Sequence, residues 1–146
     1  MRVHQHDSGS LPPAARGHAL GERWSGPISR AIAGYQEHFR QLGISDQATA
    51  SIAADSYHAL RTWSPRLAEE LNSISAGAGV SLQSLSMLNA RTEVLVAAPD
   101  RGDGECSTAV RTAPDTAAIA FQTWDWHAAL VPDALMWRYE NAPGHW

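Results

Sequence analysis

The chain has 146 residues, of which 44% are hydrophobic, 18% charged and 8% aromatic. This composition is typical of one globular domain and excludes a disordered or membrane-embedded chain. Fifteen acidic and eleven basic residues give a net charge of −4, and the basic residues are not clustered, so we expect no nucleic-acid partner. Every basic residue is arginine, which excludes a lysine Schiff base or a phosphate-loop lysine in this stretch.

Cysteine content and hydropathy exclude further classes of protein. The single cysteine, Cys106, excludes an intrachain disulfide and a multi-cysteine structural zinc site. No run approaches the roughly 18 apolar residues that span a bilayer, and residues 1–9 are polar where a signal peptide would be apolar. We therefore expect no membrane partner and a cytoplasmic location.

Apolar periodicity predicts helices before the acidic, glycine-bearing stretch 100–105. A first helix has Pro27 in its first turn and carries apolar residues at steps of three and four, namely Trp24, Ile28, Ile32, Tyr35, Phe39 and Leu42.

A second helical pattern is interrupted by Ser64-Pro65, which marks either a kink or a fresh helix start. Gly77 and Gly79 end this pattern. Its apolar residues are Ile52, Leu60, Trp63, Leu67 and Leu71. Ser81 caps a third predicted helix, which carries Leu82, Leu85 and Leu88 and reaches toward Val94.

Beyond Gly104 the apolar period becomes that of strands. Two short runs, 106–112 and 117–123, are separated by the turn signal 113–115 and predict a hairpin. Alternation through Leu135, Trp137 and Tyr139 predicts another strand, which ends at a turn over 141–144. No partner follows this last strand, so we expect the chain to be truncated.

The single thiol follows a flexible loop, and we expect Cys106 at the first position of a strand. A thiol there can attack the carbonyl carbon of the preceding residue, and cleavage then frees a new N-terminus. The new α-amino group has an intrinsic pKa near ~8 and can act as the base for the thiol of the same residue. The alternative interpretation is that Cys106, as a lone cysteine beside a strand, is a small buried apolar residue without a chemical role.

Three ordered motifs surround this thiol: Leu-Asn-Ala-Arg-Thr-Glu at 88–93, Gly-Asp-Gly-Glu-Cys-Ser-Thr at 102–108 and Gln-Thr-Trp-Asp-Trp at 122–126. In this order and spacing they resemble the acyl-CoA:6-aminopenicillanic acid acyltransferase family, also called isopenicillin N acyltransferase-like, of the N-terminal nucleophile (Ntn) hydrolases. Residues 8–21 resemble the family's start, in which a short strand leads through a glycine-histidine-glycine stretch into a long helix. Residues 74–80 resemble its next helix junction.

The resemblance implies an α+β fold, the N-terminal part of a four-layer αββα sandwich, with a helical front half followed by antiparallel strands. It implies a zymogen that cuts itself between Glu105 and Cys106. Residues 1–105 would form the mostly helical α chain and residues 106–146 the start of the β chain, and the two chains would stay together.

The resemblance also implies roles for residues after the hairpin. Asp125 matches an aspartate beside the nucleophile, where a carboxylate orients the new ammonium group or hydrogen-bonds the substrate. Trp126 matches a residue that lines the acyl pocket, and His127 follows it. Their structural alternatives are a strand-end turn for Asp125 and core filling for Trp126 and His127.

Three further residues are supporting candidates. Arg91 and Glu93 are two residues apart on a predicted helix, so their side chains do not face each other and each pairs with another group. One interpretation is an ion pair that holds the cleavage loop. The alternative is that both residues lie at a solvated helix end. Thr108, like Ser107, follows the nucleophile and is placed to donate a hydrogen bond near it, unless the strand satisfies the hydroxyl.

The chain departs from the family pattern at two positions. Glu105 stands where the best-known fungal member has glycine, and a side chain there limits the strain that the scissile bond can adopt. Thr123 stands where that member has asparagine. The family's oxyanion-stabilising asparagine and its substrate-contacting arginine correspond to positions beyond residue 146.

Three alternatives come from other classes. The first is a cysteine–histidine acyl enzyme that pairs Cys106 with His127 or His58 and stays in one piece. The second is metal binding by residues 4, 6 and 7 (His, His and Asp) in a mobile polar terminus. The third is a non-catalytic helical binding module built on the six tryptophans and the amphipathic helices.

Together the residues and the resemblance predict an autoproteolytic cysteine amidohydrolase or acyltransferase that forms a thioester on Cys106. Its expected partners are a small-molecule acyl donor and acceptor, with acyl-CoA among the candidate donors. We expect no cofactor and no metal. The residues leave open whether water or an amine takes the acyl group.

Overall fold

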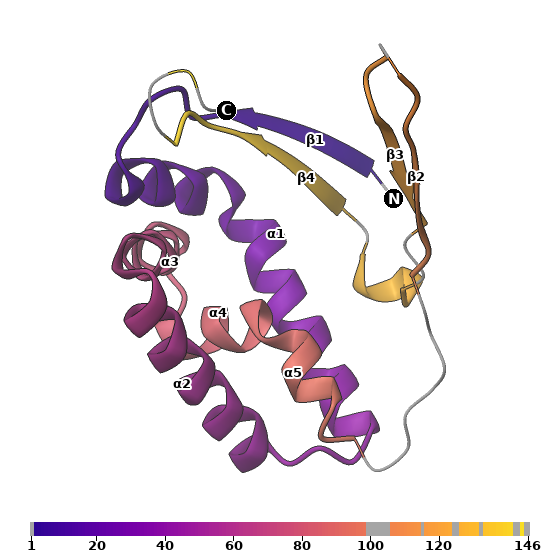
Figure 1. Cartoon of the computed structure of the whole chain (residues 1–146). Coiled ribbons are helices and arrows are strands. Elements are labelled where there is room, and N and C mark those ends of the chain that lie inside the picture. The colour runs from indigo at the N-terminus through magenta and orange to yellow at the C-terminus, as the bar shows by residue number, and fades with distance from the viewer. Residues whose placement is uncertain are drawn as a thin grey trace.

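The computed structural model describes residues 2–98, 106–114, 116–123, 126–131, 133–141 and 144. It combines helices with short strands, so the α+β class is confirmed (Figure 1). The helices are α1 (Pro13–Gln41), α2 (Asp46–Trp63), α3 (Pro65–Ala78), α4 (Leu82–Asn89), α5 (Arg91–Leu95) and the 3-10 helix η1 (Ala128–Leu130). The strands are β1 (Arg2–Asp7), β2 (Thr108–Arg111), β3 (Ile119–Gln122) and β4 (Asp133–Arg138). None of the described helices is both long and apolar enough to cross a membrane.

The long helix α1 is bent at Trp24, whose φ of −109° and ψ of 16° are not helical. Pro27 lies in the first turn beyond the bend, but α1 begins at Pro13, so the expectation that a helix starts at Pro27 is wrong. Proline lacks an N–H group and its ring clashes with the carbonyl four residues earlier, which accounts for the bend at this place. The expectation that the glycine-histidine-glycine stretch 17–21 leads into a helix is wrong, because this stretch already belongs to the first arm of α1.

Caps separate the next three helices. Ser64 ends α2 and precedes α3, with Pro65 at its first position, so this pair is a fresh helix start. Gly79, in the left-handed conformation with φ of 66°, ends α3, whereas Gly77 lies inside the helix. Ser81 caps α4, because its Oγ accepts a hydrogen bond from the Ser84 N–H at 3.0 Å.

The first arm of α1 packs against α3 at very short distance. An added Cβ at Gly21 or Gly77 would overlap backbone atoms of the opposite helix. Beside these glycines, Arg16 is 2% exposed, and its Nε donates a hydrogen bond of 2.6 Å to Oε2 of Glu70. The Arg16 guanidinium also lies 4.1 Å from the ring centroid of Tyr139. The two helices therefore bury a charge whose partner lies within hydrogen-bonding distance.

The main core lies where the second arm of α1 meets α2, α4 and α5. It consists of Ile32, Tyr35, Phe39, Ile44, Ala53, Met87 and Val94. The face predicted for the first helix is confirmed from Ile28 to Leu42. Trp63, by contrast, is 78% exposed, so its prediction as part of the second apolar face is wrong. Because α2 ends at Trp63 and a new helix follows, a periodicity drawn across both helices does not describe one face.

Strand β4 does have a partner, so the expectation of an unpaired last strand is wrong. It pairs in parallel with β1, from Arg2 opposite Asp133 to Asp7 opposite Arg138. A parallel partner comes from a distant part of the chain, which local sequence patterns do not reveal. The pairing also corrects the expectation of a mobile terminus. In Figure 1 the first arm of α1 lies between this sheet and α3.

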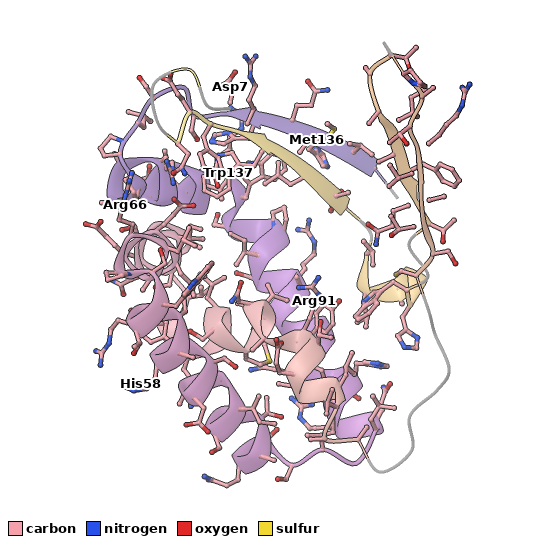
Figure 2. All side chains as sticks on the ribbon, in the orientation of Figure 1. Asp7, His58, Arg66, Arg91, Met136 and Trp137 are labelled. Atoms are coloured by element: carbon pink, nitrogen blue, oxygen red, sulfur yellow. The ribbon has the colours of Figure 1, made fainter. Side chains whose placement is uncertain are left out.

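Side chains fasten the β1–β4 sheet to its surroundings. His4 Nε2 lies 2.9 Å from Asp133 Oδ1, and this hydrogen bond holds the pKa of the Asp133 carboxyl below its usual range. Trp137 Nε1 donates a hydrogen bond of 2.9 Å to Oγ of the buried Ser8, whereas the neighbouring Met136 is 62% exposed (Figure 2). Trp137 and Met136 therefore lie on opposite faces of β4.

Strands β2 and β3 form the predicted antiparallel hairpin, from Thr108 opposite Gln122 to Arg111 opposite Ile119. Every residue of both strands is exposed. Within the described residues the hairpin and the β1–β4 sheet are separate two-stranded units. The four-layer sandwich and its division at residue 105 stay predictions.

Candidate functional site

The single thiol lies at the open end of the hairpin. Cys106 is exposed and its thiol is free. It is not the first residue of the strand as expected, because β2 begins at Thr108. The Thr123 N–H donates a hydrogen bond of 2.8 Å to the Ser107 carbonyl, which extends the pairing by one residue pair. Cys106 therefore stands one residue outside the pairing, at the end where β3 continues to Trp126.

The hydroxyl of Thr123 fastens this end of the hairpin. Its Oγ1 accepts a hydrogen bond of 3.1 Å from the Ser107 N–H and lies 3.4 Å from the Ser107 carbonyl oxygen. A threonine at this position therefore bonds both backbone polar groups of the residue next to Cys106. Thr108, the predicted donor near the thiol, is an exposed strand residue opposite Gln122.

Trp126 anchors the segment after the hairpin to α1. Its Nε1 donates a hydrogen bond of 2.6 Å to the hydroxyl of Tyr35, and its half-buried ring packs against the main core. The same side chain thus fills space at the core edge and stands near the open end of the hairpin. Tyr35 was foreseen only as a core residue. A polar hydroxyl on an otherwise apolar helix face was the signal for a second role.

His127 contacts His38, which lies on the same face of α1 as Tyr35. The two ring centroids are 4.5 Å apart, and His38 Nε2 is buried with no hydrogen-bond partner among the described residues. Burial, with a smaller contribution from the nearby His127, lowers the pKa of His38 below its ordinary value. Sequence reasoning did not single out His38, because its partner is nearly ninety residues away along the chain.

Arg91, the first residue of α5, lies beside Trp126. The centre of its guanidinium is 5.8 Å from the centroid of the Trp126 ring, and the side chain is half-buried. Glu93 is exposed. Among the described residues neither Arg91 nor Glu93 forms an ion pair, so the expected pairing of each with another charge is not seen in this part of the chain.

Two predicted residues lie outside the described part of the chain, namely Glu105 and Asp125. The cleavage-loop stretch 100–105 also lies outside it. The described site therefore consists of the thiol, the hairpin end and the anchoring cluster on α1 and α5. We call Tyr35, His38, Arg91, Trp126 and His127 the anchoring cluster.

The structure separates the other candidate residues from the thiol. His58 is exposed on α2, on the side of the helical layer away from the hairpin (Figure 2), so it is wrong as a partner for Cys106. His4 and His6 face one side of β1, and Asp7 faces the other. Across the described residues no group of three or more metal-binding side chains comes together.

A cavity of about 280 Å³ opens between α1, α2 and α4. Its lining includes Gln36, Arg40, Thr49, Gln83 and Met87. None of the predicted site residues lines it, so it is distinct from the anchoring cluster.

Comparison with known proteins adds no assignment to this geometry. No model of a protein family matches the chain, and no curated protein sequence matches it either.

Proposed function

We propose that this chain belongs to a cysteine Ntn enzyme, an autoproteolytic amidohydrolase or acyltransferase. One observation carries the proposal. The exposed thiol of Cys106 stands one residue before the paired hairpin, at the end that continues to the half-buried Trp126. The order of motifs that resembles the Ntn family supports the same assignment.

Self-cleavage starts when Sγ of Cys106 attacks the carbonyl carbon of Glu105. A carbon–sulfur bond forms, and the carbon–nitrogen bond breaks as the nitrogen takes up a proton, so residue 105 becomes a thioester. Water then attacks this thioester and leaves a carboxylate at Glu105, a free thiol and a free α-amino group at Cys106. The hydrogen bonds that fasten Ser107 hold the backbone on the C-terminal side of the bond.

Turnover uses the same two groups of Cys106. The α-amino group accepts the thiol proton, and the thiolate attacks the acyl carbonyl carbon of an amide or thioester. The leaving amine or thiol takes up that proton, and the acyl group stays on sulfur as a thioester. Water or an amine acceptor then releases it. In this proposal Trp126 forms one wall of the acyl pocket.

A second candidate is a cysteine–histidine acyl enzyme that does not cut itself. It is favoured by the exposure of His127, which follows by four residues the Thr123 that pairs next to Cys106. Here the imidazole would replace the α-amino group as the base.

Intact mass and N-terminal sequencing of the protein expressed from its natural gene test the proposal. We expect a chain that begins at Cys106 in the wild type and in Ser107→Ala, which removes a neighbouring hydroxyl but not the thiol. Cys106→Ala should stay whole. Cleavage that persists in Cys106→Ala contradicts the proposal.

An uncut wild type would also overturn the α-amino mechanism. The second candidate then predicts that a thioester reagent acylates Cys106 in the wild type, and that His127→Ala slows this acylation strongly. His58→Ala is the matched control, because its imidazole lies on the far side of the helices.

A further inference from the structure

Arg91 is a half-buried cation with unused hydrogen-bond donors. It has five N–H donors and no acceptor. Within the described part of the chain its side chain makes no hydrogen bond and no ion pair, and its guanidinium lies beside the Trp126 ring. By comparison, Arg16 is buried against Glu70, and Arg40 bonds Glu37. A partly desolvated guanidinium that lacks such a partner is suited to bind an anion.

The Trp126 ring beside Arg91 is held in place. Trp126 is fixed by its hydrogen bond to Tyr35, so the ring under the guanidinium has a set orientation. The N–H donors of a guanidinium beside an aromatic ring can form a bidentate pair with a carboxylate. The neighbouring imidazoles of His38 and His127 add no negative charge.

The location of Arg91 connects it to the thiol. Figure 2 shows Arg91 on the side of the helical layer that faces η1 and the hairpin. Trp126 follows Thr123 by three residues, and Thr123 pairs with the residue after Cys106. A molecule held at Arg91 and Trp126 therefore contacts the segment that follows the hairpin end where the thiol stands.

We propose that Arg91 is a specificity-determining residue that binds a carboxylate group of the acyl substrate, against the ring of Trp126. The link to an acyl substrate rests on the proposed function, whereas carboxylate binding itself does not. The substrate class is an amide or thioester that carries a free carboxylate.

Binding of N-acetylglycine to the full chain tests this inference, with N-acetylglycinamide as its neutral match. The probe carries an amide and a carboxylate, and the match replaces only the charge. The readout is the NMR signal of the Trp126 indole N–H, assigned with Trp126→Phe. We expect a saturable shift with the acid and none with the amide at the same concentrations.

Variants separate Arg91 from general positive charge. Arg91→Gln should weaken binding of the acid by about tenfold or more, as expected for loss of hydrogen bonds to a charged group. Arg91→Lys should retain part of it. Arg66→Gln, which removes an exposed arginine far from Arg91 (Figure 2), should bind as the wild type does.

Several results would overturn the inference. These are equal binding of acid and amide, the absence of a saturable shift, or an equal loss in Arg91→Gln and Arg66→Gln. If Arg91→Gln does not fold, the comparison of acid with amide on the wild type still tests whether the site binds a carboxylate. The readout requires no cleavage and no turnover, so Cys106→Ala gives the same answer, and failure of the proposed enzyme function remains a separate result.

Discussion

The α1–α3 contact and the β2–β3 hairpin differ sharply in how they are held. In the first, two backbones meet at Gly21 and Gly77, and a buried arginine pairs with a buried glutamate. In the second, every strand residue is exposed, and Ser107 and Thr123 fasten the open end. The buried contacts between helices therefore stabilise the fold more than the exposed hairpin does. The thiol lies on the less constrained unit, next to the segment that Trp126 anchors to α1.

The largest effect is expected from breaking the buried ion pair. Glu70→Leu leaves Arg16 buried without its carboxylate, which costs about 3–5 kcal/mol. The free energy of unfolding in urea measures this loss. The double variant Arg16→Met/Glu70→Leu should recover most of it, because two apolar side chains replace both charges.

An exposed pair supplies the contrast. Glu37→Gln removes the carboxylate that Arg40 bonds, but Glu37 is 57% exposed and the expected cost is below about 1 kcal/mol. Equal losses in Glu70→Leu and Glu37→Gln would show that burial of Arg16 does not matter to stability.

A somewhat smaller effect is expected at the helix contact. Gly77→Ala places a methyl group against the backbone of α1 at His18, so the helices must move apart, at about 1–3 kcal/mol. Gly26→Ala is the matched control, because its Cβ would meet only the flexible end of Arg30 at 3.4 Å. The control should be unchanged or stabilised by about 0.5–1 kcal/mol, as is usual for alanine in a helix. A similar loss in both variants would contradict close α1–α3 packing.

Acidification should lower the free energy of unfolding because of His38 and His6. Burial lowers the pKa of each below the ordinary value of about 6.5, with help from His127 for His38 and from Arg23 for His6. Between the ordinary pKa of about 6.5 and the lower pKa in the folded protein, the unfolded state binds more protons than the folded state does. Stability is therefore highest above about pH 6.5 and falls as the pH drops through this interval.

The pH dependence of unfolding in urea checks this expectation. His38→Gln should flatten the decline, and His58→Gln, an exposed residue on α2, should leave it unchanged. An unaltered decline in His38→Gln would exclude His38 as a source.

The smallest effect is expected on the hairpin. Phe121 is 64% exposed, so Phe121→Thr should change the free energy of unfolding by no more than about 0.5 kcal/mol. A loss above about 1 kcal/mol would contradict the exposed position and narrow the difference between hairpin and helices.

Local patterns predicted the elements well where one segment contains the whole signal. Ser81 caps a helix, Ser64-Pro65 marks a break in a helical pattern, and the turn signal at 113–115 stands between the two strands of a hairpin. Each of these depends on neighbours within a few residues. Trp63 shows the limit, because its periodicity ran across two different helices.

The candidate site divides in the same way. The thiol and the tryptophan beyond the hairpin were candidates from chemistry and motif order, whereas the exposure of Cys106 was not predicted. The hydrogen bond of Trp126 to Tyr35 and the contact of His127 with His38 could not, because each joins residues about ninety positions apart.

By itself, the sequence determined the α+β class, the helix caps and the hairpin, since these follow from short-range periodicity and backbone preferences. Tertiary structure decided that β4 pairs in parallel with β1, that Arg16 is buried against Glu70, and that Arg91 lies over Trp126. Such contacts depend on how distant segments pack, and packing is settled only when the whole chain has excluded water from its core.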